Sequence, residues 1–244
     1  MVGHVDYGER DRIVRLLCPD HGRISALARG ARGSTRRFAG ALDLGNRVEA
    51  MLRPGAGELW HLQEASLLRG VEGLRSDLGR LSLMAYACEL CAALAREHHP
   101  EPRLFGLLDT ALLLLDATSE PPAAAFRVGL EAKALTFAGL TPALDRCAVC
   151  AEALEGEALA FWGERGGACH ARCAPGAPLV EPAWLRAIEE ARRTPLRELI
   201  DRPLPAGPAW ALAEMAEAML GKGLRSRHLL ASLETPPRPV TSPP

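Results

Sequence analysis

The hydrophobic pattern changes its period near Ser76 and thereby divides this sequence into two parts. Before this point, apolar residues alternate with polar ones in short runs that Gly, Pro and Asp separate. After it, apolar residues recur at helical spacing, as at Leu78, Leu81, Ala85 and Cys88. Alternation is typical of half-buried strands, and the longer period is typical of helices with one buried face. We therefore expect a two-domain α+β protein, with strands in residues 1–75 and helices in residues 76–235.

Five strands are expected in the first domain, at residues 2–5, 12–18, 23–28, 47–52 and 59–68. A Pro-Gly-Ala-Gly hairpin loop at residues 54–57 joins the last two. Five strands in about seventy residues match the size of a small closed barrel such as an OB-fold. Strand counting alone does not separate this fold from an SH3-like barrel or another small barrel, so these alternatives stay open.

Helices are expected through most of the second domain, and Ser76 is a suitable N-cap for the first of them. The others are expected at residues 104–117, 123–138, 183–192, 208–220 and 226–233. The proline-rich residues 236–244 are expected to be disordered. The longest apolar run is too short to span a bilayer and no export signal is visible, so we expect a cytoplasmic protein without membrane segments.

Arginine and glycine accumulate in residues 23–42. No acidic residue lies between Asp20 and Asp43, and residues 10–53 hold ten arginines but only four acidic residues. Arginine carries a permanent charge and five donors that suit phosphate oxygens, while glycine lets a backbone come close to such a ligand. The alternative is a solvated surface turn.

The candidate nucleic-acid-binding residues are therefore Arg23, Arg29, Arg32, Arg36, Arg37, Phe38 and Arg47. The arginines would neutralise phosphates without reading a base sequence. Phe38 is the one aromatic residue within the basic run, where it could stack on a base or pack in the core.

Two close cysteine pairs occur late in the chain, Cys147 with Cys150 and Cys169 with Cys173. Their separation matches a structural zinc ribbon, in which four thiolates close a tetrahedral Zn²⁺ site. Aromatic and glycine residues between the pairs suit a short hairpin that brings them together. We expect a zinc-binding insertion over residues 145–176. His170 could replace a neighbouring cysteine, although the simpler arrangement keeps it outside the ligand set.

A further C-x-x-C pair, Cys88 and Cys91, lies on a strongly helical stretch. Buried core thiols are favoured there over a redox pair. The motifs H-E-x-x-H, G-x-x-x-x-G-K-[ST] and G-x-S-x-G are all missing from the sequence, so we expect no enzyme. Two other functions stay open: a zinc-ribbon scaffold for proteins without direct DNA binding, and a thiol oxidoreductase that uses this pair.

Several motifs, taken in order, resemble the RecO family of bacterial recombination mediators and DNA repair proteins. They are YGERD at 7–11, ARGAR at 28–32, RFAGAL at 37–42, GLTPALDRC at 139–147 and LRSR at 224–227. The resemblance implies an N-terminal OB-fold, a helical C-terminal domain and a zinc-binding insertion. It also implies binding to single- and double-stranded DNA, annealing of complementary strands, and help in loading a recombinase onto coated single strands.

The partners that the resemblance implies are RecR and the acidic C-terminal tail of single-strand DNA-binding protein, with a location at the nucleoid. Two departures from the family pattern have structural consequences. The chain begins close to the YGE motif, so either its start lies late within the family's first strand or that strand is short here, and both alternatives affect one edge of the expected barrel. Ala151 stands where a glycine usually follows the first cysteine pair, so a strained or altered turn is expected there.

Overall fold

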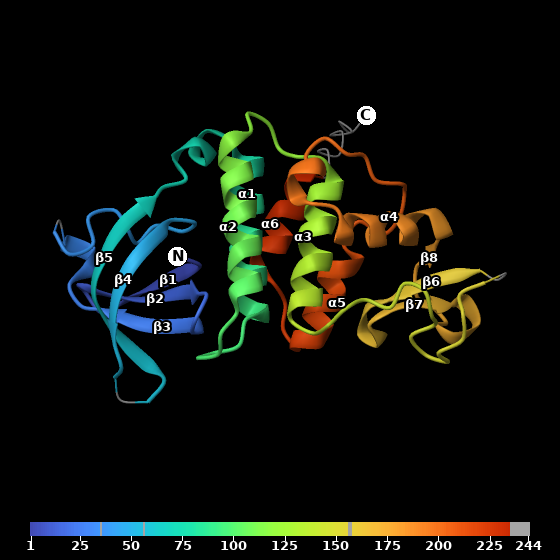
Figure 1. Ribbon diagram of the computed structural model, residues 1–244, viewed down its shortest axis with the longest axis horizontal. Coiled ribbons are helices and arrows are strands. Elements are labelled where there is room, and N and C mark those ends of the chain that lie inside the picture. The colour runs from blue at the N-terminus through green and yellow to red at the C-terminus, as the bar shows by residue number, and fades with distance from the viewer. Residues whose placement is uncertain (35, 56, 156–157, 235–244) are drawn as a thin grey trace, which may run out of the picture.

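Two sheets and a helical bundle lie in a row along the molecule (Figure 1). The computed structural model describes residues 1–234 apart from residues 35, 56 and 156–157. A five-stranded sheet lies at one end, the helices occupy the middle, and a three-stranded sheet lies at the other end. The predicted α+β class, with an N-terminal sheet and C-terminal helices, is confirmed. Residues 236–244, for which we predict disorder, lie outside the described residues.

The N-terminal sheet has the strand order β1-β2-β3-β5-β4. Its strands are β1 (Gly3–Tyr7), β2 (Asp11–Cys18), β3 (Gly22–Ala28), β4 (Arg47–Arg53) and β5 (Leu59–Arg69). Strands β3 and β5 are parallel and the other neighbours are antiparallel. Ile24, Ala26 and Ala28 are buried at alternate positions of β3, which is the alternation seen in the sequence.

The prediction of a closed barrel is wrong, because β1 and β4 are the two edges of this sheet and do not pair. The N-terminal residue makes a short link between them. The Met1 amine donates to the Asn46 carbonyl oxygen at 2.7 Å, and the Gly45 amide donates to the Met1 carbonyl oxygen at 3.0 Å. Strand β1 has only five residues, which pair with β2 along one edge, and no ladder joins its other edge to β4.

Six helices are described beyond the sheet. They are α1 (Leu78–Leu94), α2 (Pro102–Ala117), α3 (Ala124–Phe137), α4 (Pro182–Arg193), α5 (Ala211–Leu220) and α6 (Arg225–Glu234). Asp77 caps α1 by accepting a hydrogen bond from the Arg80 amide at 2.7 Å, so the predicted cap at Ser76 is one residue too early. Within the described part of the chain, no helix is long and apolar enough to cross a membrane.

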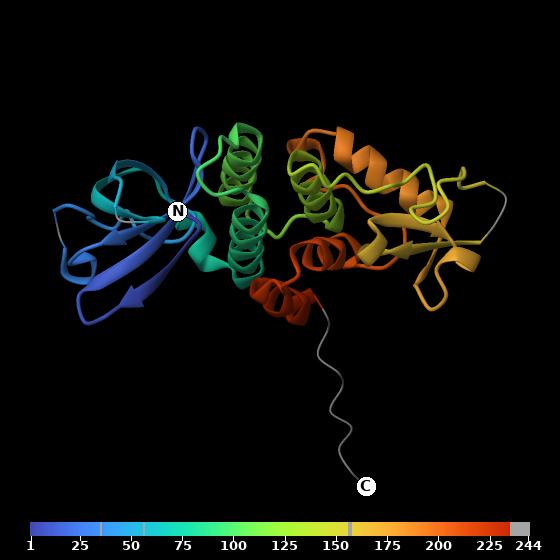
Figure 2. The same cartoon turned by 90° about the horizontal axis from the view of Figure 1, so that it is seen from below.

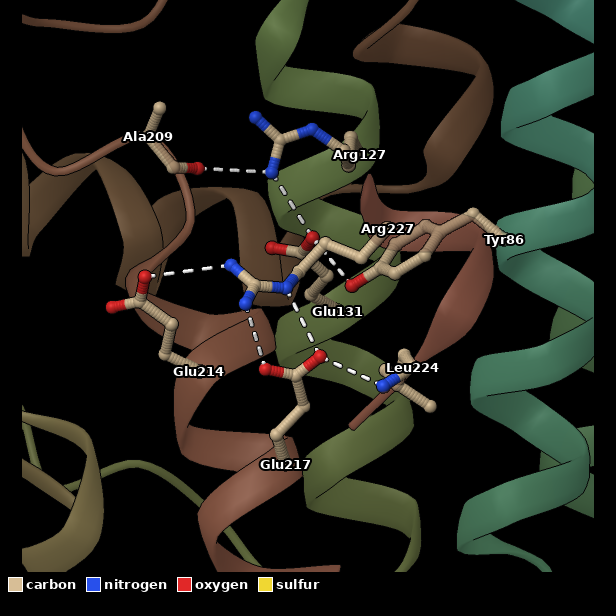
Figure 3. Close-up of polar contacts among 8 residues, drawn as sticks. All are labelled: Tyr86, Arg127, Glu131, Ala209, Glu214, Glu217, Leu224 and Arg227. Atoms are coloured by element: carbon tan, nitrogen blue, oxygen red, sulfur yellow. Dashed lines mark hydrogen bonds and ion pairs between the residues drawn. The ribbon is translucent and has the colours of Figure 1, made fainter. Parts of the chain in front are cut away.

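Two sets of polar contacts lie in the bundle, one between α1 and α3 and the other between α5 and α6 (Figure 3). The Arg127 and Glu131 side chains form an ion pair at 3.0 Å and are 4% and 1% exposed. Tyr86 donates a hydrogen bond to Glu131 at 2.9 Å, and burial together with this carboxylate raises the pKa of Tyr86 well above its ordinary value. Arg227 pairs with Glu217 at 2.9 Å. These contacts connect α1 to α3 and α5 to α6, and the protein's own carboxylates neutralise both arginines.

Arginines also attach the N-terminal sheet to the helices. The Arg23 guanidinium pairs with Glu97 at 2.9 Å, and its backbone amide donates to the Arg96 carbonyl oxygen at 3.0 Å. Next to it, Gly22 packs against the loop after α1 so closely that a Cβ would lie 2.2 Å from the His99 carbonyl oxygen. These contacts join the turn between β2 and β3 to the α1–α2 loop.

The second sheet contains β6 (Leu159–Trp162), β7 (Gly167–His170) and β8 (Leu179–Val180), in the order β7-β6-β8. Strands β6 and β7 form the antiparallel hairpin predicted between the two cysteine pairs. Figure 2 shows this lobe at the end of the molecule opposite the N-terminal sheet.

Candidate nucleic-acid interface and metal centre

A cationic pocket lies at one end of the N-terminal sheet. Its volume is about 540 Å³. Arg29 follows β3, Arg37 belongs to the next loop and Arg53 ends β4, so separate segments of the chain supply the charges. His61 of β5 adds a further polar side chain to the lining. The pocket can therefore surround an anion with donors on several sides.

The loop that carries Arg37 is held by its own residues and by β5. The Arg37 Nη2 donates to the Arg29 carbonyl oxygen at 2.6 Å, and the Ala65 amide donates to the Arg37 carbonyl oxygen at 2.9 Å. Gly30 begins the loop with a φ of 67°, a left-handed conformation that glycine adopts without strain. The Arg37 side chain is thus presented from a fixed backbone.

Phe38 packs in the core of the N-terminal sheet, which is the second of the two roles considered for it. Its side chain is 2% exposed and belongs to the same apolar cluster as Ile24 and Leu62. The Arg37 guanidinium lies 5.0 Å from the centre of its ring. A buried ring offers no face to a base, so Phe38 anchors the loop and supports Arg37 instead.

The six predicted arginines fall into two groups. Arg29, Arg36 and Arg37 are exposed, and none of them pairs with a carboxylate among the described residues. Arg23 pairs with Glu97 at 2.9 Å, Arg47 with Asp109 at 2.6 Å and Arg32 with Asp6 at 3.8 Å. Of the six predicted arginines, only Arg29, Arg36 and Arg37 therefore carry a charge that a ligand could pair with.

Arg53 is a pocket residue that the sequence reasoning omitted from the candidate site. It is exposed, and in the described part of the chain it has no carboxylate partner. Arg53 ends β4 directly before the predicted hairpin loop, and this position in the sequence would have allowed it to be predicted as a site residue. The parallel pairing of β3 with β5 brings Leu27 opposite His61, and both of these residues line the pocket.

At the far end of the molecule, four potential metal ligands converge. The ligand atoms of Cys147, Cys150, His170 and Cys173 all lie within 4.8 Å of one another. The Cys150 Sγ is 3.5 Å from the His170 Nδ1, and the Cys150 amide donates to the Cys147 Sγ at 3.5 Å. Three sulfur donors and one imidazole are a ligand set that suits a tetrahedral zinc ion.

The predicted set of four cysteines differs from this group at one position. Cys169 is fully buried, and its thiol donates to the Gly167 carbonyl oxygen at 3.8 Å. Burial, followed by the nearby Cys147, raises the pKa of Cys169 to about 11. The spacing holds a signal for His170, because His170 and Cys173 are separated by two residues, as are Cys147 and Cys150.

The first cysteine pair occupies a tight turn that favours a thiolate. Burial opposes ionisation of Cys147, but the backbone amides of Cys150, His170 and Val149 outweigh it and lower the pKa of Cys147 to about 6. Ala151 has a φ of 62°, so the strained turn predicted from the missing glycine is confirmed.

Cys88 and Cys91 have no such environment. Both side chains are fully buried on α1, and burial raises the pKa of Cys88 to about 12. Burial raises the pKa of Cys91 as well. The predicted role as core thiols is confirmed, and the inaccessible, protonated pair does not support thiol oxidoreductase chemistry.

Comparison with known proteins identifies the relatives of this chain. The family description Recombination protein O N terminal matches residues 1–71, and Recombination protein O C terminal matches residues 75–230. The DNA repair protein RecO of Anaeromyxobacter dehalogenans strain 2CP-C is 42% identical over 236 residues, which cover 93% of this chain and 91% of that protein. The chain belongs to the RecO family.

Other RecO proteins agree with this assignment. The DNA repair protein RecO of Myxococcus xanthus strain DK1622 is 39% identical over 202 residues, covering 80% of this chain and 82% of that protein. The DNA repair protein RecO of Geobacter metallireducens is 36% identical over 171 residues, which cover 69% of this chain and 68% of that protein. The resemblance predicted from the sequence motifs is confirmed, and membership of the RecO family supports a role in DNA recombination and repair.

Proposed function

We propose that this RecO family member is a non-enzymatic recombination mediator that binds single- and double-stranded DNA through the cationic pocket of its N-terminal sheet. The observation that carries the proposal is the gathering of Arg29, Arg37 and Arg53 around one pocket without carboxylate partners among the described residues. Arg36, which is also exposed, adds to the same charge. DNA phosphates supply the missing counter-charge.

The binding is led by electrostatics and does not depend on base sequence. Phe38 is buried, and Trp60 is half-buried with its ring stacked on His98 at 5.8 Å between centres. Neither ring therefore offers a free face for several bases. Guanidinium groups that hold the phosphates of two strands reduce the mutual repulsion of those strands, which favours annealing without nucleotide hydrolysis. Assistance in loading a recombinase onto coated single strands follows from the same activity.

A charge-matched pair of triple variants tests this site. R29A/R37A/R53A removes three unpaired arginines, whereas R75A/R197A/R202A removes three arginines that are each paired with a carboxylate. We expect the first variant to weaken oligonucleotide binding and to lower the slope of log K against log salt by about 2 to 3. The second variant should keep the slope of the unchanged protein. Equal slopes in both variants would show that DNA is bound elsewhere.

The annealing step is tested with the same proteins. Fluorescently labelled complementary strands should anneal more slowly with R29A/R37A/R53A than with R75A/R197A/R202A at equal ionic strength. If the pocket variant bound DNA weakly but annealed strands at the normal rate, the link between binding and annealing would be wrong.

The acidic tail of single-strand DNA-binding protein has a candidate groove between α4 and the metal-binding lobe. This groove has a volume of about 710 Å³, and its apolar lining includes Leu144, Leu154, Leu159 and Leu185. Its charged lining residues are Asp145, Arg186, Glu189, Glu190, Arg192 and Arg193. Arg186 on its rim is exposed and has no carboxylate partner among the described residues. R186E should weaken binding of a synthetic tail peptide and leave DNA binding unchanged. RecR is proposed as a partner on family membership alone.

We also propose a structural Zn²⁺ for the cluster of cysteines and His170. A fully ligated ion has no open position for catalysis, so it would hold the lobe together. The scaffold alternative, in which the lobe recruits proteins and DNA binding is incidental, predicts negligible salt-sensitive affinity for DNA. The salt-dependent DNA affinity of the unchanged protein, measured in the same titrations, decides between the two functions.

A further inference from the structure

His170 and Cys169 are neighbours on β7 and therefore point to opposite faces of the small sheet. Cys169 pairs with Ala160 of β6, and its side chain lies in a buried cluster with Cys147, Ala160 and Ala174. Its thiol donates to the Gly167 carbonyl oxygen at 3.8 Å. His170 is directed toward Cys150. Among the described residues, the ligand atoms that all lie within 4.8 Å of one another are those of Cys147, Cys150, His170 and Cys173, and the Cys169 Sγ is not one of them.

The imidazole of His170 is held by its second nitrogen. The side chain is 2% exposed, and Nε2 lies 3.0 Å from the Ala153 carbonyl oxygen. When Nε2 carries the proton and donates to this oxygen, Nδ1 keeps its lone pair free on the side of Cys150. Metal-binding histidines are commonly oriented in this way by a backbone carbonyl.

The two ligand pairs have the same spacing, and each lies on a single tight turn of the backbone. Cys147 and Cys150 flank one turn, in which the Ala151 amide donates to the Cys147 carbonyl oxygen at 2.9 Å. His170 precedes a short 3₁₀ helix that ends at Cys173. Two residues lie between the ligands of each pair, whereas three lie between Cys169 and Cys173. The pair that matches the first turn is therefore His170 with Cys173.

We propose that the zinc of this RecO family member is bound by Cys147, Cys150, Cys173 and the Nδ1 of His170, and that Cys169 is a core residue outside the ligand set. The inference rests on the proposed structural zinc and specifies its donors. Three thiolates and a neutral imidazole give the centre a net charge of −1, whereas four thiolates would give −2. Cys169 remains the natural competitor, because its thiol lies in the same apolar cluster as Cys147.

X-ray absorption spectroscopy of the full chain loaded with one equivalent of Zn²⁺ tests the donors directly. We expect three sulfur neighbours and one nitrogen neighbour in the unchanged protein. Cys169→Ala should bind the same amount of zinc with the same neighbours. His170→Cys should give four sulfur neighbours, and with Co²⁺ in place of zinc its thiolate charge-transfer absorbance should rise by about one third.

The outcomes separate the two proposals. Four sulfur neighbours in the unchanged protein, or the loss of one sulfur in Cys169→Ala, would overturn the donor set while leaving the structural zinc in place. Failure of the unchanged protein to take up zinc would overturn both. Retained uptake by Cys169→Ala alongside weakened uptake by Cys173→Ser would support the inference even if a His170 variant did not fold.

Discussion

Arg37 of the N-terminal sheet and Arg127 of the helical bundle both lie over an aromatic ring, but they use their charge differently. The Arg37 guanidinium is 5.0 Å from the centre of Phe38 and is exposed without a carboxylate partner among the described residues. The Arg127 guanidinium is 3.9 Å from the centre of Trp210, is buried, and pairs with Glu131. The Arg37 charge in the sheet can therefore bind a ligand, whereas the Arg127 charge in the bundle is neutralised by a buried carboxylate.

The number of arginines in a segment therefore does not give the positive charge that the segment can offer to a ligand. Arg127 pairs with an acid of its own helix, because Arg127 and Glu131 are four residues apart on α3. In the sheet the paired acids come from distant elements, as with Arg23 and Glu97 or Arg47 and Asp109. Available charge is what remains after both kinds of pairing.

The largest effect is expected from breaking the buried pair. Arg127→Ala removes the cation that lies 3.0 Å from the buried Glu131 carboxylate and should lower the free energy of unfolding by about 3 to 5 kcal/mol. Urea denaturation followed by circular dichroism measures this change. Removal of the exposed Arg37 should shift the same curve by less than about 0.5 kcal/mol. Equal losses of stability at the two sites would show that the Arg37 charge is as important for folding as the Arg127 charge.

The next effect concerns DNA affinity and separates the two groups of predicted arginines. R29A/R36A/R37A removes unpaired charge and should weaken DNA binding by about ten- to a hundredfold at moderate salt. R23A/R32A/R47A removes the same formal charge from arginines that are already paired, and should weaken binding less. It should instead lower stability, because Arg23 and Arg47 connect the sheet to the helices. Titrations of one labelled oligonucleotide, together with thermal unfolding, measure both quantities.

Local patterns predicted the elements of this fold well. The alternation at Ile24, Ala26 and Ala28 marks β3, and the helical period of Leu78 and Leu81 marks α1. These signals are local because a strand or helix buries one face whatever its neighbours are. The cysteine pairs likewise predicted a hairpin lobe, since the spacing of ligands is a property of the chain itself.

The pairing of distant groups could not be predicted in the same way. No local pattern indicates that Glu97 meets Arg23, or that β1 and β4 leave the sheet open. Whether Cys169 or His170 lies against Cys150 depends on the register in which β7 pairs with β6. Such features arise from tertiary packing. A shift of one residue in strand register turns a different side chain toward a given face.

A smaller effect is expected at the strained turn of the metal-binding lobe. Ala151 adopts a left-handed φ of 62°, which costs a residue with a Cβ about 1 kcal/mol relative to glycine. Ala151→Gly should therefore stabilise the zinc-loaded protein by up to about 1 kcal/mol, measured by thermal unfolding. The equivalent change at Ala148, which lies in the same turn, should bring no gain, because Ala148 has no positive φ. A loss of stability in Ala151→Gly would show that the turn is not strained.

The smallest effect has the opposite sign, because it releases charge in the N-terminal sheet. Asp6 pairs with Arg12 at 3.0 Å and with Arg32 at 3.8 Å, and all three side chains are at least partly exposed. Asp6→Asn should leave the midpoint of thermal unfolding essentially unchanged, since exposed ion pairs contribute little. It should nevertheless raise DNA affinity by about twofold, because a carboxylate no longer competes with phosphate for the two guanidinium groups.

The charge of Asp6 also links this effect to pH. The hydrogen bond from Arg12 holds the pKa of Asp6 below its ordinary value, so the carboxylate is ionised at neutral pH and becomes protonated only under acidic conditions. The affinity difference between Asp6→Asn and the unchanged protein should therefore be constant near neutral pH. It should disappear as the pH falls through the lowered pKa, because the unchanged protein then loses the same negative charge. A difference that persisted in acid would assign the effect to the shape of the β1 edge instead of to its charge.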